Sequence, residues 1–292
     1  MIPMNMKSIL KMAVKNLLRF LPDKTYLQLR YLITFRRPLN LRCPKTYSEK
    51  LQWMKLYDRN PLYNQLVDKY DVRAFVAERI GEEHLIPCLG VWDSFEEIDF
   101  AALPDSFVLK CTHDSGSVRI CNDKKLLDMA QLRMHFAAAL RDEQYYGGRE
   151  WAYKNLKSRI IAEAFMVDDS GTGLKDYKFF CFDGKVKAMF IATDRGVPGQ
   201  DVKFDFFDEN FNHLPFKHGH ENAKVPPQKP DRFEDMIELA EKLSEGLRHV
   251  RVDLYNINGD IYFGEMTFYH HCGFVPFDPP QWDDTFGSWI RV

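Results

Sequence analysis

The sequence predicts an α+β fold, in which antiparallel hairpins pack against separate helices. Residues 251–268 have the pattern of a hairpin that turns at Asn258-Gly259, and residues 176–194 have the pattern of a second hairpin that turns at Asp183-Gly184. Residues 233–247 carry apolar side chains at the spacing of an amphipathic helix. This mixture of hairpins and packed helices favours the α+β class.

The other elements follow from local signals along the chain. The stretch "TYSE" at 46–49 is a capping box, which opens a helix that runs through Leu56. The remaining predicted elements are, in order, a helix over 62–80, strands over 106–112 and 118–121, a helix over 124–142 capped by Asn122 or Asp123, a strand over 158–166 and a strand over 202–210.

The composition is that of an ordinary globular protein. The chain has 292 residues and is 45% hydrophobic, so it can bury a large core in one or two domains. No apolar stretch is long enough to cross a bilayer. The six cysteines include no CxxC pair, and five lie in or beside apolar runs. This usage suits reduced thiols in a cytoplasmic protein better than a disulfide framework.

Charge is distributed unevenly. Residues 1–60 contain 13 Lys/Arg and 3 Asp/Glu, whereas the remainder contains 27 and 39. The segment "MKSILKMAVKNLLRFLPDK" has an amphipathic helical rhythm but no small-residue cleavage site, so it is a poor signal peptide. Two interpretations stay open: a helix packed on the body with a solvated basic face, or a peripheral contact with a membrane or an anionic polymer. We expect no nucleic-acid partner.

The hairpin over 251–268 carries polar residues where a core hairpin would be apolar. Arg251 and Asp253 share one face of the first strand, and Glu265 and Thr267 share one face of the second. Carboxylates on adjacent strands suit Mg²⁺, and the arginine offers a fork for phosphate oxygens. An ion-pair ladder between Arg251 and Glu265 explains the pattern equally well.

Parity decides whether the two carboxylates can meet. A two-residue turn at Asn258-Gly259 pairs Asp253 with Gly264 and points Glu265 to the other face. A shared metal site therefore requires a three-residue turn or a β-bulge, for which Gly264 is a suitable position.

Two further segments carry candidate binding residues. Lys110 ends an apolar strand just before the loop "HDSGS", whose backbone N–H groups around Ser115 and Gly116 could cradle a phosphate, although such loops commonly just join strands. Glu163 lies in an apolar strand, and Asp176 and Lys178 share a face of the next one, where core polar residues satisfied by neighbours are the alternative.

The order of these fragments resembles the ATP-grasp superfamily, and in particular its TupA-like branch, which is associated with teichuronopeptide and other surface-polysaccharide biosynthesis. The resemblance covers residues 45–292 and rests on "TYSEKLQWMKLYDRNPLYNQLVDKYDVRAFV", "LGVWDSFEEIDFAALPDSFVLKCTHDSG", "DYKFFCFDGK", "FGEMTF" and "GSWI". It implies two α+β lobes that clamp ATP. We expect a basic N-terminal helical arm over 1–44, a helical lobe over 45–105, and an ATP-grasp region over 106–292, divided into a small lobe (106–165) and a large lobe (166–292).

The resemblance also implies roles for individual residues, with ATP and Mg²⁺ as cofactors. The nucleotide is expected to contact Lys69, Lys110, Ser115, Gly116, Glu163, Asp176 and Lys178. Asp253 and Glu265 match the metal carboxylates, with Thr267 as a third ligand, and Arg251 matches the arginine that steadies the transferred phosphoryl group. Lys178 and Arg251 are the expected catalytic residues.

Two departures from the family pattern stand in this segment. Thr267 occupies a position where the superfamily often has Asn. The run "YHHCGF" replaces an expected Pro-Gly turn, and its adjacent His and Cys do not have a credible zinc spacing, because neighbours on a strand point opposite ways. His270 and His271 are expected either to line the acceptor side without a catalytic role or to supply a base for an amine.

The expected activity is that of an ATP-dependent carboxylate–amine ligase that acts through an acyl phosphate. By family analogy its substrates are a carboxylate-bearing sugar or glycan and an amine acceptor. The alternatives are an ATP-dependent kinase or transferase that acts on a glycan hydroxyl and a degenerate nucleotide-binding protein. The expected location is cytoplasmic, with possible peripheral contact at the inner face of the membrane.

Overall fold

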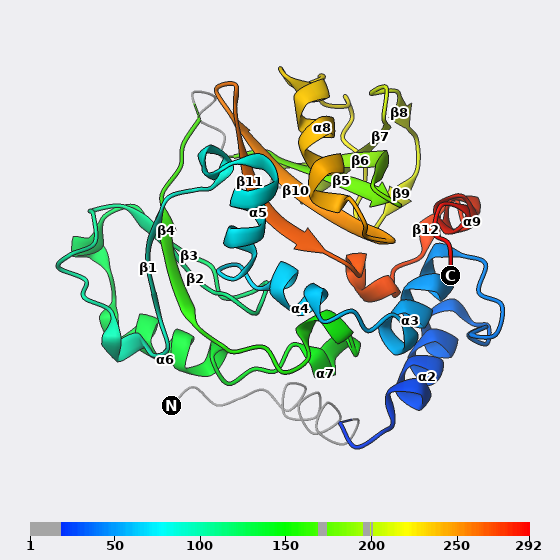
Figure 1. Ribbon diagram of the computed structural model, residues 1–292, viewed down its shortest axis with the longest axis horizontal. Helices are drawn as coiled ribbons and strands as arrows, with labels where there is room; N and C mark the ends of the chain where they lie inside the picture. Colours follow the sequence, from blue (N-terminus) through cyan, green and yellow to red (C-terminus); the bar gives the residue numbers. More distant parts are fainter. Residues whose placement is uncertain (1–18, 169–173, 195–198, 200) are drawn as a thin grey trace.

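The computed structural model describes residues 19–168, 174–194, 199 and 201–292. Within them the chain forms two β-sheets with helices packed around them, which confirms the α+β prediction. Figure 1 shows the smaller sheet at the left and the larger one above and to its right, with α5 between them in that view. The predicted amphipathic segment of the basic arm spans residues 6–24, and its part over 6–18 lies outside the described residues.

Helices dominate the first part of the described chain. They are α2 (Asp23–Phe35), α3 (Tyr47–Tyr57), α4 (Leu62–Val67) and α5 (Val72–Ile80). Helix α3 begins with the predicted capping box, because Thr46 accepts from the backbone of Glu49 and Glu49 accepts from the backbone of Thr46.

The helix predicted over 62–80 is wrong as one element, since it is broken between α4 and α5. Asp68 Oδ1 accepts the backbone N–H groups of Tyr70 and Asp71 at 2.9 Å each, a local turn that competes with helix. The Lys69 backbone N–H instead donates to Thr112 O at 3.0 Å. The break therefore ties Lys69 to the end of a strand in the small sheet.

The small sheet has the order β1-β4-β2-β3 and is antiparallel throughout. Its strands are β1 (Cys88–Trp92), β2 (Phe107–Cys111), β3 (Arg119–Cys121) and β4 (Ile160–Ala164). Strand β1 was not predicted from the sequence. It forms one edge of the small sheet and comes from the region before residue 106, for which only helices were expected.

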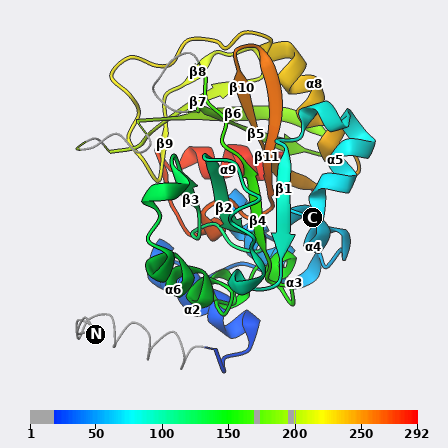
Figure 2. The ribbon, with the colours of Figure 1, turned by 90° about the vertical axis from the view of Figure 1, so that its left-hand side faces the viewer.

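One face of the small sheet packs on α6 (Met129–Ala139), which Figure 2 shows below the sheet. The helix predicted over 124–142 is wrong at its start. Asp123 caps only a 3₁₀ turn (Lys124–Leu126), and the helix itself begins at Met129 and is capped by Asp128, which accepts from the Gln131 backbone. A short α7 (Tyr145–Gly148) and a 3₁₀ turn (Trp151–Tyr153) lead to β4.

The large sheet has the order β11-β10-β5-β6-β7-β8. Its strands are β5 (Asp176–Phe182), β6 (Lys185–Thr193), β7 (Lys203–Asp208), β8 (His213–Leu214), β10 (His249–Ile257) and β11 (Asp260–Thr267). Both predicted hairpins are confirmed as β5–β6 and β10–β11. Strands β9 (Lys217–His218) and β12 (Phe277–Asp278) pair separately, and α9 (Gln281–Ser288) ends the described chain.

The two faces of the large sheet differ in chemistry. Helix α8 (Phe233–Ser244) covers one face, where Phe179 packs against Phe233 and the Cys181 thiol reaches the carbonyl of Ala240. Figure 1 shows α8 on the outer side of the sheet. The even-numbered residues of β5 point to the other face. There Phe180 and Phe182 pack against Tyr47 of α3, while Asp176 and Lys178 continue the same row.

In the described part of the chain, no helix is long and apolar enough to cross a membrane. All six cysteines are free thiols, three of them buried, two half-buried and Cys43 exposed.

A candidate nucleotide and metal site between the two sheets

A bulge in the β10–β11 hairpin brings the two candidate metal carboxylates together. Ile257 pairs with Asp260 around a two-residue turn at Asn258-Gly259, and the register then shifts at Gly264 so that Asp253 pairs with Glu265. The bulge alternative of the sequence analysis is therefore confirmed, and the three-residue turn is not used. A Cβ at Gly264 would meet the Asp253 carbonyl oxygen at 3.1 Å.

Arg251 binds both carboxylates from the same face. Its guanidinium donates to Asp253 through Nε at 2.7 Å and through Nη2 at 2.8 Å, in a bidentate pair. Nη2 also donates to Glu265 Oε1 and to Thr267 Oγ1, each at 3.0 Å. The Arg251–Glu265 ion pair predicted as the alternative is present, but it belongs to a largely buried network rather than to a surface ladder.

Lys178 joins this network from the neighbouring strand. It pairs with Asp253 in the β5–β10 register, and its ammonium forms an ion pair with the Asp253 carboxylate. Asp176 lies two residues away on β5, with its carboxylate 3.7 Å from the same ammonium. The structure thus places Asp176, Lys178, Arg251, Asp253, Glu265 and Thr267 on one face.

The electrostatic balance keeps Glu265 ionised. Burial opposes its charge, but Lys178, Arg251 and Lys69 outweigh burial and lower the pKa of Glu265 to about 2. Burial raises the pKa of Asp253, and the attraction of Arg251 and Lys178 opposes that rise. Glu265 is the more accessible of the two, with a side chain 35% exposed against 2% for Asp253.

The small sheet offers a second polar group. Leu109 of β2 and Ala162 of β4 face the core on α6, so Lys110 and Glu163 face the opposite side. The Lys110 ammonium lies 2.5 Å from the Glu163 carboxylate, and Arg73 of α5 lies 3.8 Å from it.

Lys69 connects the two groups. Its ammonium donates to the Asp114 carbonyl, and the neighbouring charges that act on it include Glu265 of the large sheet and Lys110 of the small one. Burial lowers the pKa of Lys69. The helix break at Asp68 is therefore what places a cation between the sheets.

The loop after Lys110 is anchored at its base and open at its tip. Ser117 Oγ donates to Asp114 at 2.6 Å and accepts from the Cys111 backbone at 2.7 Å. Ser115 and Gly116 are exposed, and a Cβ at Gly116 would meet nothing within 4 Å. The tip is therefore exposed and uncrowded, and a phosphate contact at Ser115 and Gly116 stays a prediction.

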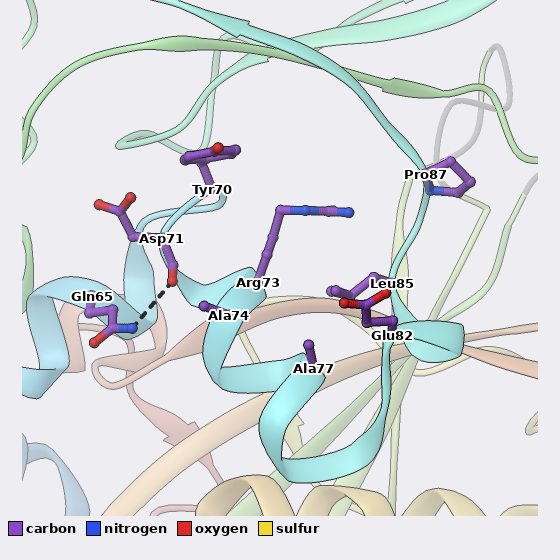
Figure 3. Close-up of a pocket in the computed structure, with 9 residues that line it drawn as sticks. All are labelled: Gln65, Tyr70, Asp71, Arg73, Ala74, Ala77, Glu82, Leu85 and Pro87. Atoms are coloured by element: carbon purple, nitrogen blue, oxygen red, sulfur yellow. Dashed lines mark hydrogen bonds between the residues drawn. The ribbon is translucent and has the colours of Figure 1, made fainter.

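A pocket of about 890 Å³ opens beside this polar face. Figure 3 shows the Arg73 side chain extending from α5 across the pocket, with Tyr70 and Asp71 on one side and Leu85 and Pro87 on the other. Arg73 was missed by the sequence analysis. Its place in "DKYDVRAFV", four residues after Lys69, was the available signal.

His270 and His271 do not lie on a strand, which corrects the premise used for their spacing. They belong to a 3₁₀ turn, His270–Gly273, in which His271 and Cys272 have φ values of 50° and 55°. Helix α3 holds this turn: Gln52 donates to Gly273 O at 2.9 Å, and Lys55 donates to Cys272 O at 2.7 Å. The two imidazoles consequently lie side by side, with ring centroids 4.1 Å apart.

The sequence of residues 49–291 matches the family described as TupA-like ATPgrasp. The chain belongs to that family. The fold and the family expected from the sequence are therefore confirmed. No curated protein matches the sequence.

Solved structures similar to this TupA-like ATP-grasp protein include ATP-grasp ligases. D-alanine--D-alanine ligase from Bacillus anthracis, complexed with ATP, is 14% identical with a TM-score of 0.41 over 70% of this chain and 54% of its own. The ATP-grasp ligase PsnB, complexed with a minimal precursor, is 12% identical with a TM-score of 0.41 over 75% and 58%. D-Alanine-D-Alanine ligase from Helicobacter pylori is 15% identical with a TM-score of 0.42 over 85% and 70%. The chain thus spans little more than half the length of the first two.

The side chains at the bulge fit a magnesium ion chemically. Two carboxylates and a hydroxyl are hard oxygen donors, and Glu265 presents its ionised carboxylate at the more open end of the face. Arg251 and Lys178 supply the positive charge that holds these carboxylates together without a metal. The assignment of Asp253, Glu265 and Thr267 as metal ligands stays a prediction.

Proposed function

We propose that this protein is an ATP-dependent carboxylate–amine ligase that acts through an acyl phosphate. Membership of the TupA-like ATP-grasp family supports the ligase class. The observation that carries the proposal is the register shift at Gly264, because it collects Arg251, Asp253 and Glu265 on the face that Lys178 shares.

Four cationic side chains of the protein would offset negative charge during phosphoryl transfer. Lys110 and Lys69 approach from the side of the small sheet and the helix break, and Lys178 and Arg251 approach from the large sheet. Such cations offset negative charge that develops on the phosphoryl oxygens. Asp253 and Glu265, with Thr267, would hold Mg²⁺, which would supply positive charge for phosphoryl transfer.

The proposed reaction has two steps, and each step forms one bond and breaks another. A carboxylate oxygen of the substrate attacks the γ-phosphorus of ATP and the bond to ADP breaks, which converts a poor electrophile into an acyl phosphate. An amine then attacks the acyl carbon, the bond to phosphate breaks, and the amine gives up a proton as inorganic phosphate leaves. Neither step needs a nucleophilic side chain on the protein, which agrees with the absence of a Ser-His-Asp or Cys-His arrangement in the sequence.

The substrates we propose are a carboxylate-bearing sugar or glycan, such as a uronic acid, and an amino acid or small amine. The surface-polysaccharide role that the sequence resemblance implies is what suggests this class, by analogy. Arg73 is a suitable partner for the substrate carboxylate, because its guanidinium crosses the 890 Å³ pocket and contacts the Glu163–Lys110 pair.

The test measures ADP and phosphate release over a matrix of acids and amines, with Glu265→Gln as the inactive control. A ligase releases both products only when acid and amine are present together. Release of ADP without inorganic phosphate would contradict the ligase and indicate a kinase that acts on a hydroxyl. If no pair of acid and amine gives ADP although ATP still binds, the protein binds nucleotide without turnover.

A further inference from the structure

Three histidines gather at one point beyond the metal carboxylates. His270 and His271 come from the turn after β11, and His218 comes from β9. Each has a ring nitrogen within 4.8 Å of a ring nitrogen of the other two. His218 and His270 are almost fully buried, with 2% and 1% of their surface exposed. We call His218, His270 and His271 the histidine trio.

Each member of the trio presents a ring nitrogen without a partner. These atoms are His218 Nδ1, His270 Nε2 and His271 Nε2. A buried polar atom without a hydrogen bond costs free energy, so three such atoms on rings that gather this closely indicate a missing occupant.

The opposite edges of two rings are fixed by backbone carbonyls. His218 Nε2 lies 3.0 Å from Val275 O, and the His271 ring hydrogen-bonds the backbone of His218. A hydrogen bond from the far nitrogen to a carbonyl leaves the near nitrogen as a bare lone pair, which is the usual preparation of a metal-bound histidine. Burial also lowers the pKa of His218 to about 3 and of His271 to about 4, so both rings are neutral near pH 7.

Room for the cluster depends on Gly219. A Cβ at this position would lie 2.7 Å from His271 Nε2, so any other residue would press on that nitrogen. Gly219 also has a φ of 86° and lines an open pocket of about 590 Å³. The missing side chain at Gly219 therefore leaves His271 Nε2 uncrowded on that side.

We propose that the histidine trio binds one divalent transition-metal ion of the zinc class, at a site distinct from the magnesium carboxylates. Three imidazoles suit Zn²⁺ and its soft neighbours, whereas Mg²⁺ prefers oxygen. Three protein ligands leave a fourth position open to water or to a substrate group. Nitrogens bound to one zinc ion lie about 3.3 Å apart. Zinc binding therefore requires the ring nitrogens, which now lie within 4.8 Å of one another, to move closer together.

The site is coupled to the catalytic arginine. Arg251 Nη1 donates to His270 Nδ1 at 2.7 Å, so the neutral ring carries its proton on Nε2, the nitrogen without a partner. Metal binding breaks this Nε2–H bond, forms a metal–Nε2 bond and releases the proton to solvent. The resulting imidazolate stays beside the Arg251 guanidinium, whose positive charge balances it.

The experiment is zinc titration of the chelator-treated full chain by calorimetry, with metal content measured after dialysis. We expect one Zn²⁺ per chain, retained in a tenfold excess of Mg²⁺. His218→Ala and His271→Ala are expected to lower zinc affinity by at least about 100-fold. The matched control is His220→Ala, whose ring centroid lies 6.4 Å from that of His271 but outside the trio; it should bind zinc as the unmodified chain does.

Cobalt gives a readout that is independent of folding defects in the variants. Co²⁺ bound to the unmodified chain should show the visible absorption of a four-coordinate nitrogen site, and Zn²⁺ should remove it. Unchanged zinc affinity in His218→Ala, or no stoichiometric zinc binding by the unmodified chain, would overturn the proposal. A crystal soaked in zinc with no anomalous signal at the trio would also overturn it and would assign the three nitrogens to a water molecule.

Discussion

Asp253 lies directly opposite Glu265 across the β10–β11 hairpin, although the turn at Asn258-Gly259 taken alone would place it opposite Gly264. One extra residue in β11 produces this pairing, and the residue is the glycine itself. The face that carries Arg251 therefore receives a carboxylate from each strand. The proposed site depends on this register, because a shift of one residue would move every side chain of the second strand to the opposite face of the sheet.

Parity predicts opposite results for two changes of equal size. Deletion of Gly264 puts Glu265 in the position opposite Asp253 without a bulge, so both carboxylates keep their face. Insertion of a second glycine after Gly264, with the single bulge kept, pairs Glu265 with Val252 and turns it towards α8. We expect the deletion to keep Mg²⁺-dependent binding of a nonhydrolysable ATP analogue and the insertion to weaken it at least about tenfold. Calorimetry with and without Mg²⁺ measures this difference.

Thermal unfolding of both variants provides the control. Loss of Mg²⁺ dependence in the folded deletion variant would show that the carboxylates do not act together on a metal.

The sequence predicted this hairpin well because its signals are local. Turn residues, alternation and a glycine at a suitable position restricted the pairing to two solutions, and the bulge at Gly264 was one of them. Strand β1 lacked such a signal, since its five residues are all half-buried and show no alternation.

Other features depend on contacts between distant residues. The helix predicted over 62–80 breaks because Lys69 bonds to Thr112, a partner that local propensity cannot reveal. The HisHisCys turn depends on Gln52 and Lys55, more than 200 residues earlier, and His218 joins the trio from another strand. Sequence spacing could therefore predict the carboxylates, but it could not predict that adjacent histidines converge.

Glu265→Gln is expected to lower turnover at least about 100-fold with little loss of stability, because the side chain is partly exposed and a neutral amide is a poor Mg²⁺ ligand. Asp253→Asn should also abolish turnover, but it leaves the buried Arg251 and Lys178 without their main counterion. We expect that variant to lose on the order of 3 kcal/mol of unfolding free energy. ADP release and urea denaturation distinguish the two cases, and normal turnover of Glu265→Gln would exclude a metal role.

Lys110→Met is expected to weaken ATP-analogue binding at least about tenfold while the fold persists. Glu163 keeps Arg73 as a partner in this variant, so the carboxylate is not left unpaired. Lys185→Met is the matched control. Lys185 lies at the start of β6, where it forms an exposed ion pair at 2.5 Å with Glu241 of α8. Equal affinities of the two variants, measured by calorimetry, would remove Lys110 from the nucleotide site.

The basic arm makes a separate prediction about anionic surfaces. We propose that residues 1–44 contact an anionic membrane or polymer, because the first 60 residues carry a large excess of Lys and Arg. Binding to vesicles with 30% anionic lipid should fall steeply between about 0.05 and 0.3 M salt, as screening shortens. Deletion of residues 1–18 should abolish vesicle binding without changing ATP-analogue affinity. Salt-independent binding, or unfolding of the truncated chain, would favour a helix that packs on the protein body.

Lys55 gives a prediction about pH that concerns the support of the HisHisCys turn. Its side chain is buried, and burial lowers its pKa from 10.5 to about 8 despite the nearby Glu150. The unfolded chain therefore binds more protons than the folded chain between about pH 8 and 10.5. Unfolding free energy consequently rises with pH in this window. Below about pH 8 Lys55 is protonated in both states, so its pH-dependent gain in stability is absent there.

Between pH 7.5 and 9.5 the expected gain from Lys55 is on the order of 2 kcal/mol, from a shift of about 2.5 pKa units. Lys55→Met should remove this rise, because methionine keeps most of the buried chain but carries no proton to lose. Urea denaturation of both proteins at the two pH values isolates the effect, since all other titrating groups are shared. A parallel pH dependence in the variant would show that Lys55 titrates in the folded chain as it does in the unfolded one. In that case burial would not be opposing its charge, and the ammonium that holds Cys272 O would be stable well above pH 8.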